Sequence, residues 1–391
     1  MRTSRVLALA LALPLLAAGG LAAQQDRPGV DVSFHGTILL NGFYTSARTN
    51  NSDLPQFAVP ETAADSFPTD GIGGTLRQTR VMVRAFLPEL GGAEWRAELD
   101  ADFFGGQQPS NGGRTFPLLR IRRAWLEGQW NRFSMLIGQE APPIVELNPV
   151  TTSSFGLSAL SSSGNLWLWI PQIRFTGDVV QGKSARVQLE GAVLAPTGYT
   201  PQPPFATDFD RAEQTKRPYL QGRLRVRWGS GETAGEVSAG GHYGWLSTAG
   251  DTTLASKAVA ALLLLPLGKH LELRGEAFSG EGIAGLGGGS IGQVFGLGGR
   301  TIRTKGGWGQ LNIRPTPEWT LGGSFGMDDP KDADLDTTVQ RLKNVTWGGH
   351  VHWRPAPLLF GLEVRQAKTT YGTGVGELKA THVNVAAGFE F

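Results

Sequence analysis

The chain has 391 residues, no cysteine, and 36 lysines and arginines against 34 aspartates and glutamates. The absence of cysteine excludes a disulfide scaffold, and the near balance of charge gives no support to a nucleic-acid partner. Glycine is abundant at 55 residues, yet the sequence shows neither a collagen period nor a long low-complexity tract.

Residues 1–23 have the pattern of a secretory signal peptide. Arg2 and Arg5 supply the positive charge, VLALALALPLLAAGG supplies the apolar run, and the following GLA supplies a small-x-small cleavage signal. The run is short and Pro14 interrupts it, which disfavours a membrane anchor. We therefore expect an exported protein.

Residues 24–391 are predicted to form a single domain. No run of 18 or more apolar residues follows the leader, so no membrane-spanning helix is expected. No linker or shift in composition marks a boundary, although a soluble chain of this length usually divides into two or more domains.

Apolar and polar residues alternate along most of this domain. In WRAELDADF, for example, Trp95, Leu99 and Phe103 fall on one face and Asp100 on the other. A period of two is typical of a β-strand. Sixteen such segments begin near residues 31, 76, 95, 117, 133, 172, 184, 219, 235, 255, 270, 305, 318, 344, 358 and 378.

The predicted connections alternate between short and long. Seven short joints and eight long ones match sixteen antiparallel strands in up-and-down order, as in outer-membrane barrels with short periplasmic turns and long outer loops. The short joints lie near 88–93, 131–132, 181–183, 229–234, 267–269, 316–317 and 356–357. The long joints are 45–75, 105–116, 139–171, 196–216, 247–254, 279–302, 328–343 and 368–377.

The strands of a soluble β-sandwich would show the same alternation, so the composition of the two faces decides between a sandwich and a membrane barrel. The polar faces carry dense charge of both signs, as a water-filled lumen requires. The apolar faces have aliphatic residues and glycine in mid-strand, with aromatic residues near strand ends, as expected at a membrane interface. These features favour an all-β transmembrane antiparallel barrel, with an aromatic girdle of Trp95, Trp125, Trp228, Trp245, Trp319 and Trp353.

Three short motifs resemble a known family. LRIRRAW at 119–125, IGQ at 137–139 and PQIRFTGD at 171–178 look like the core of the trimeric DcaP-like porins, within the broader phosphate-selective and general porins. The resemblance in sequence covers residues 76–180, and the rest of the chain resembles the family in its predicted architecture only. It implies sixteen strands, a homotrimer in the outer membrane of a Gram-negative-type bacterium, a third loop folded into the pore, and a preference for small anionic solutes, including dicarboxylates.

The C-terminal segment ATHVNVAAGFEF alternates up to Phe391. An aromatic ring beside a charged carboxylate suits a membrane–water boundary. Phe391 also resembles the signal that the outer-membrane assembly machinery reads, which makes that machinery an expected partner.

The third long joint, 139–171, is too long for an ordinary loop in a compact protein and suggests a functional one. It carries Glu140 and Glu146 but no lysine or arginine. Its apolar Leu157, Leu160, Leu166 and Trp167 need burial, which favours a constriction loop inside the barrel over a cover on its outer surface.

Strand parity places a set of arginines on the lumen face. Arg223 and Arg225 are expected opposite Ser238 and Gly240, with acid partners scarce and the loop glutamates facing them, so that they attract anions. The alternative is a fully paired network in the wall, since arginine readily forms bidentate carboxylate pairs. The candidate anion-binding residues are Arg80, Arg84, Arg120, Arg122, Arg174, Arg186, Arg223, Arg225 and Arg227.

The charges on strand 95–103 are expected to be neutralised locally, because Glu98 and Asp100 lie beside Arg80 and Arg84. His350 and His352 share a face, but no third ligand stands at a diagnostic spacing, so neither a metal site nor a cofactor is expected. We predict a porin for passive diffusion of small hydrophilic solutes. An outer-membrane enzyme, or a closed barrel for adhesion or scaffolding, remains the alternative.

Overall fold

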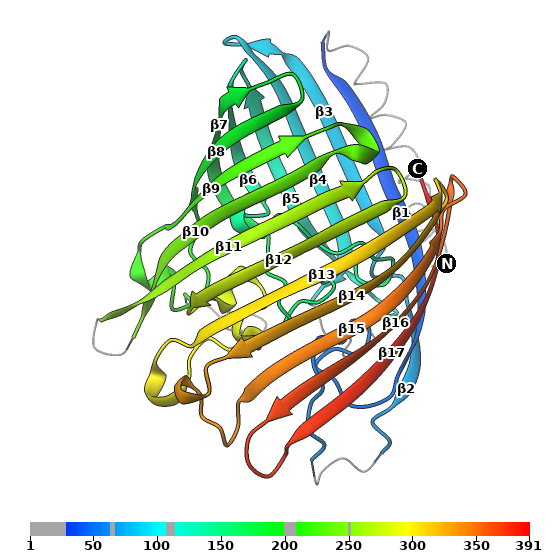
Figure 1. The fold of residues 1–391 in the computed structure, drawn as a ribbon, viewed down its shortest axis with the longest axis vertical. Helices are drawn as coiled ribbons and strands as arrows, with labels where there is room; N and C mark the ends of the chain where they lie inside the picture. The colour runs from blue at the N-terminus through cyan, green and yellow to red at the C-terminus, as the bar shows by residue number, and fades with distance from the viewer. Residues whose placement is uncertain (1–28, 63–66, 107–113, 199–208, 249–251) are drawn as a thin grey trace, which may run out of the picture.

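The computed structural model shows one closed β-barrel (Figure 1). The predicted signal peptide lies outside the described part of the chain. The structure describes residues 29–62, 67–106, 114–198, 209–248 and 252–391.

Seventeen strands form one antiparallel sheet in which successive strands are neighbours, and β17 pairs with β1 to close it (Figure 1). The strands are β1 (Asp31–Thr45), β2 (Gly71–Thr75), β3 (Arg80–Leu90), β4 (Ala93–Gly105), β5 (Leu118–Gln129), β6 (Phe133–Glu140), β7 (Ile170–Gln181), β8 (Ala185–Leu194), β9 (Tyr219–Trp228), β10 (Gly235–Ser247), β11 (Thr253–Leu267), β12 (Leu271–Glu281), β13 (Arg303–Thr316), β14 (Trp319–Pro330), β15 (Arg341–Trp353), β16 (Leu358–Tyr371) and β17 (Glu377–Glu390).

β2 and β3 are two parts of one barrel strand. β2 pairs with residues 41–45 of β1, and β3 pairs with residues 31–37 of the same strand. The barrel therefore has sixteen strand positions in up-and-down order, which confirms the predicted architecture. The interruption falls at residues 76–79, where the sequence pattern had placed the start of the strand, and β2 lies in the segment predicted as part of the long loop 45–75.

The connections alternate between a short-turn end and a long-loop end, as predicted. Two of the expected long loops, 247–254 and 368–377, are shorter than predicted, because the flanking strands extend into the regions assigned to loops. Four of the other long loops contain 3-10 turns among the described residues. These turns are η1 (Pro143–Val145), η2 (Glu213–Thr215), η4 (Ala284–Leu286), η5 (Gly289–Gly292), η6 (Leu297–Gly299) and η7 (Asp332–Asp334), while η3 (Gly231–Thr233) lies in a short turn.

The outward face of the barrel is apolar and uncovered. On β16, for example, Leu362 and Val364 are 46% and 43% exposed, while the alternate Ala367 and Thr369 are buried on the inside. A sandwich would bury its apolar face in a core, whereas a membrane barrel presents it to lipid. The arrangement therefore defines a membrane-spanning barrel. Among the described residues, no helix is long and apolar enough to cross a bilayer.

Aromatic side chains cluster outside the barrel at the short-turn end. Ring contacts link Trp95 to Trp130 and Trp319 to Trp353, with centroids 5.9 and 5.7 Å apart. Such a belt suits the lipid–water interface. Trp125 was assigned to this belt incorrectly, because it pairs in register with inward-facing Glu98 and shares its side of the sheet.

The seam between the first and last strands includes the C-terminal residue. The Gly36 amide donates to the Phe391 carbonyl at 3.0 Å, and the Phe391 amide donates to the Gly36 carbonyl at 3.1 Å. A Cβ on Gly36 would lie 2.6 Å from the Phe391 ring, so glycine is needed for this approach. The final aromatic residue is therefore part of the closure of the barrel.

Candidate functional site: the constriction inside the barrel

The loop between β6 and β7 crosses the barrel interior. The Ile144 amide donates to Gln221 on β9 at 3.2 Å, and the Val150 amide donates to Gln310 on β13 at 2.7 Å. Further along, the Asn344 amide group on β15 donates to the Ser162 carbonyl at 2.8 Å. The loop thus contacts inward-facing side chains from several sides of the barrel.

Burial of the loop's apolar residues explains why it stays there. Leu157, Leu160, Leu166 and Trp167 are 3%, 6%, 0% and 2% exposed. They pack inside the barrel against residues such as Phe104 and against the loop after β12. The sequence predicted this burial, because an apolar loop needs a surface to cover it.

The interruption between β2 and β3 holds the loop from one side. Gln78 lies in the gap; its side-chain nitrogen donates to the Ser153 carbonyl at 3.0 Å, and its oxygen accepts from the Phe155 amide at 2.6 Å. In an uninterrupted β-strand, the backbone groups of this residue would bond to the neighbouring strand. Because the strand is interrupted here, Gln78 bonds to the loop through its side chain.

Glu363 on β16 holds the same part of the loop from three strands further round the barrel. Its carboxylate accepts hydrogen bonds from the Thr151 hydroxyl at 2.9 Å, from the Ser153 amide at 3.1 Å and hydroxyl at 2.5 Å, and from the Thr152 amide. His352 lies 3.0 Å from the same carboxylate. A carboxylate is well suited to this position, because its two oxygens can accept several hydrogen bonds at once. Glu363 was not singled out from the sequence, because nothing local indicates that it anchors the loop.

We expect Glu363→Gln to loosen this part of the loop. An amide replaces one acceptor oxygen with a donor, so buried loop donors lose their partner at a cost of about 1–3 kcal/mol in unfolding free energy. Single-channel recordings should show larger and noisier conductance. Glu377→Gln, which alters an exposed pair with Lys368 far from the loop, is the matched control, and identical traces for the two variants would contradict the anchoring role.

The arginines of β9 form a compact cluster with glutamates. Arg223 and Arg225 both contact Glu146 of the loop. They also pair with Glu190 on β8, at 2.6 and 3.2 Å, and Arg225 lies 3.1 Å from Glu236 on β10. The predicted register with Ser238 and Gly240 is confirmed, but the expectation that acid partners are scarce there is wrong.

Arg227 completes this cluster, since its Nε lies 3.7 Å from Glu236. Three guanidiniums therefore share three carboxylates, which is the paired wall network. The expectation was wrong because the side chains of Glu190 and Glu236 extend along the wall to the arginines, and the side chain of Glu146 extends to them from the loop. Arg223, whose side chain is fully buried, is committed to these pairs and fastens the loop to the wall.

The charge of Glu146 is stabilised by this arrangement. Burial on its own would raise the pKa of a carboxyl group, but the positive charges of Arg223, Arg225 and Arg174 outweigh that effect, and the pKa of Glu146 is lowered. The carboxylate therefore remains ionised at neutral pH, where the loop contact depends on its charge.

The second cluster lies on β3–β6. Arg80 pairs with Asp100 at 2.5 Å, Arg84 with Glu98 at 2.8 Å, and Arg120 with Asp102 at 2.6 Å. The local neutralisation of Arg80 and Arg84 that the sequence predicted is present.

A β-bulge changes the direction of the side chains in β5. Asp100 pairs in register with Arg123 and Ala101 with Ile121, so Arg122 is the extra residue. Arg122 and Arg123 consequently both point inward, whereas strict alternation would have turned Arg123 outward. Arg123 then reaches Glu140 at 3.0 Å, so Glu140 belongs to this wall and does not face Arg223 and Arg225 as expected.

Arg122 lacks a hydrogen-bonding partner in this cluster. Its nearest carboxylate oxygens, on Asp102 and Asp100, lie 3.7 and 3.9 Å away, and its buried Nε and Nη1 make no hydrogen bond among the described residues. Its guanidinium lies 4.5 Å from the Trp169 ring centroid. Five guanidiniums here share four carboxylates, namely Arg80, Arg84, Arg120, Arg122 and Arg123 with Glu98, Asp100, Asp102 and Glu140.

Arg122 lines a cavity of about 420 Å³ between the β3–β6 wall and the loop. Sequence reasoning identified Arg122 but missed Trp169 and Arg123. The polar and charged residues around the cavity are Arg80, Arg122, Arg123, Glu140, Glu146, Asn148, Thr151, Ser154, Ser158, Trp169 and Arg354.

The remaining predicted arginines lie elsewhere on the lumen face. Arg174 is mostly buried near the start of the loop, where Nη1 approaches the Ala141 carbonyl at 3.5 Å. Arg186 pairs in register with Arg227 near the short-turn end. Arg174 therefore adds positive charge near the start of the loop and Arg186 adds it near the short-turn end, but neither residue lines the cavity.

A closed barrel with an apolar exterior, a charged interior and a loop across its lumen defines the porin fold. No family model matches this chain, and no curated protein matches it in sequence. Solved structures do match. The chain resembles the outer-membrane channel DcaP of Acinetobacter baumannii with a TM-score of 0.69 and 18% identity, over 94% of this chain and 99% of that one.

Two further solved structures have the same fold. The anion-selective porin from Comamonas acidovorans matches with a TM-score of 0.57 and 12% identity, over 93% of this chain and 100% of that one. OmpT of Vibrio cholerae, in a trimer form, matches with a TM-score of 0.50 and 11% identity over the same shares. These likenesses establish the fold of an outer-membrane porin.

Proposed function

We propose that this protein is an outer-membrane porin that lets small hydrophilic solutes diffuse passively and prefers anions that carry carboxylates. The observation that carries the preference is Arg122, a buried guanidinium without a hydrogen-bonded carboxylate, beside a cavity between the wall and the crossing loop. A positive group in a confined, poorly solvated space concentrates anions around it.

The stacking of Arg122 on Trp169 suits this role. The ring covers one face of the guanidinium, and a planar guanidinium fork is well matched to an oxyanion. Neighbouring Arg80 and Arg123 are already paired, so they add positive potential without binding the solute tightly. Weak attraction allows a solute both to enter and to leave.

A reversal-potential measurement in a KCl gradient across a planar bilayer tests this proposal. We expect the sign of a chloride-selective pore, with the preference weakening at high salt as charges are screened. Permeation of small mono- and dicarboxylates should exceed that of amines of equal size. A cation-selective pore would overturn the anion preference, and the absence of any conductance would overturn the channel.

An enzyme is the second class to consider, because His242 and Ser256 form a contact of 3.0 Å. Both residues are buried in the wall, and the Ser256 hydroxyl donates to the Gly282 carbonyl at 2.8 Å. A nucleophile must be accessible and activated by its base, so this pair fits a structural role. Conductance separates the channel from both an enzyme and a closed scaffold.

We propose a homotrimer, supported by the resemblance and by the trimer form of the OmpT structure. The purified protein should run as a heat-modifiable oligomer, and crosslinking should stop at three subunits. A folded monomer that is soluble without detergent would contradict the proposal.

Recognition by the assembly machinery is tested at Phe391. Phe391→Asp keeps the backbone hydrogen bonds to Gly36 but removes the aromatic side chain, so we expect much less protein in the outer membrane and little change in the stability of barrels refolded in detergent. Normal membrane levels of the variant would exclude a signalling role. Val385→Asp, also on the outward face of β17, controls for lost hydrophobicity.

A further inference from the structure

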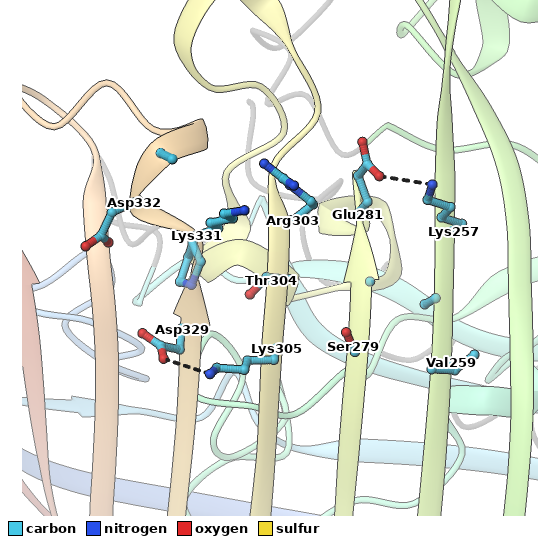
Figure 2. A pocket seen from close by; sticks show the side chains of 14 residues that line it. Lys257, Val259, Ser279, Glu281, Arg303, Thr304, Lys305, Asp329, Lys331 and Asp332 are labelled. Carbon is cyan, nitrogen blue, oxygen red and sulfur yellow. Dashed lines mark ion pairs between the residues drawn. The ribbon is translucent and has the colours of Figure 1, made fainter.

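A charged groove of about 910 Å³ lies on the outside of the barrel, at the long-loop ends of β11–β14. Figure 2 shows its side chains, which come from four neighbouring strands and from the start of the loop after β14. The lipid-facing surface of a barrel normally excludes charge from its apolar band, so such a cluster needs a partner. Its charged residues are Lys257, Glu281, Arg303, Lys305, Asp329, Lys331 and Asp332.

The strand register arranges these charges in two rows. In the outer row, Lys257, Glu281 and Arg303 pair in succession across β11, β12 and β13, and the Lys331 amide bonds to the Arg303 carbonyl at 2.8 Å. In the inner row, Lys305 pairs with Asp329 across β13 and β14. The ion-pair distances are 3.2 Å for Lys257–Glu281 and 3.9 Å for Lys305–Asp329. Arg303 is also paired with Asp334 of the loop after β14, at 2.5 Å, so Lys305 and Lys331 are the cations least engaged by carboxylates of the described residues.

The positive groups project further from the barrel than the negative ones. The side chains of Lys257, Arg303 and Lys305 are 56%, 52% and 72% exposed, against 25% for Glu281 and 28% for Asp329. The Lys331 ammonium makes no ion pair with a carboxylate of the described residues. Ligands that approach from the side of the barrel therefore meet cations first.

The groove also lies at the border of the apolar band. Val259, two residues along β11 from Lys257, is 64% exposed and lines the same groove. One outward-facing position beyond the inner row, towards the short turns, lie Ala277 on β12 and Met327 on β14. Charge thus gives way to apolar surface within one outward-facing position, which matches the boundary between a lipid headgroup and its chains.

The positive band continues around the barrel. Lys343 on β15 shares Asp329 with Lys305 at 3.9 Å, and Lys368 and Lys379 pair in register on β16 and β17. By contrast, the outward side chains of β10 near the same end include Tyr243 and Trp245, whose rings lie 5.1 Å apart. Lys368 and Lys379 share Glu377, so the lysines that are least engaged by carboxylates lie at the groove itself.

We infer that this groove binds a phosphate-bearing lipid of the outer leaflet. The long-loop end of an outer-membrane barrel faces outward, so the groove lies at the level of the outer-leaflet headgroups. Lys257, Arg303, Lys305 and Lys331 hold the phosphate groups, and the acyl chains lie along Val259 and the apolar surface beyond. Clusters of lysine and arginine at a membrane surface attract anionic headgroups in this way.

The test is binding of bis-phosphorylated lipid A to the purified, detergent-solubilised barrel, measured by native mass spectrometry. The variant is Arg303→Gln/Lys305→Gln/Lys331→Gln, and its matched control is Lys183→Gln/Lys269→Gln at the short-turn end. We expect binding to weaken by about tenfold or more in the triple variant and to stay unchanged in the control. Heat-modifiable migration on gels checks that both variants remain folded.

Four results would overturn this inference. The first is equal binding of lipid A to the triple variant and the natural chain. The second is equal binding of dephosphorylated lipid A, which would show that the chains alone decide. The third is displacement by millimolar inorganic phosphate, which would identify a site for free anions. Crosslinking of Lys305 to a second copy of the chain would also overturn it, because the groove would then be a subunit contact.

Discussion

Replacing Arg122 with glutamine is expected to lower the chloride-to-potassium permeability ratio about tenfold, the lower end of what charge focusing in a confined cleft provides. Arg122 is the guanidinium of the β3–β6 cluster that has no hydrogen-bonded carboxylate. Its loss leaves four guanidiniums and four carboxylates in the β3–β6 cluster, so the excess positive charge of this cluster beside the cavity disappears. Reversal potentials in a KCl gradient measure the change.

Arg84→Gln is the control for this experiment. Arg84 is half-exposed and paired with Glu98, which keeps Arg123 as a second partner, so the potential in the cavity should change little. Equal effects of the two substitutions would show that selectivity follows total lumen charge. An unchanged reversal potential in Arg122→Gln would mean that this residue only supports the wall.

Replacing Arg223 with methionine is expected to lower the free energy of unfolding by about 3 kcal/mol, the lower end of the cost of breaking a buried ion pair, because Glu190 keeps Arg225 as its second partner. The Arg223 side chain is fully buried against Glu190, which is itself 2% exposed. The substitution also removes one of the two arginines that contact Glu146. Urea unfolding in phospholipid vesicles measures the loss, and a noisier current should accompany it.

Arg227→Gln provides the comparison within the same strand. Arg227 is 54% exposed and lies 3.7 Å from Glu236, so its removal should cost no more than about 1 kcal/mol. If Arg223→Met were as stable as the natural chain but lost anion selectivity, Arg223 would be part of the filter, as the sequence had suggested. A large loss of stability supports its structural role.

The number of strands and their order could be predicted from the sequence because both depend on local patterns. The period of two marks each strand, and the alternation of short and long joints orders them. Even the pairing of Arg223 with Gly240 and of Arg225 with Ser238 follows from counting outward from the short turn at 229–234. A tight turn fixes the register of the hairpin that it joins.

Other features were decided only in the tertiary structure. A bulge at Arg122 and Arg123 shifts the parity of β5 and turns Trp125 inward, and the alternation of residues along β5 did not reveal it. The loop contacts at Gln78, Glu363 and Glu146 join residues 70 or more positions apart. Strand patterns specify which face a side chain occupies, whereas its partner depends on how the loop packs inside the closed barrel. The lumen arginines could therefore be located from the sequence, but the carboxylates that each of them contacts could not.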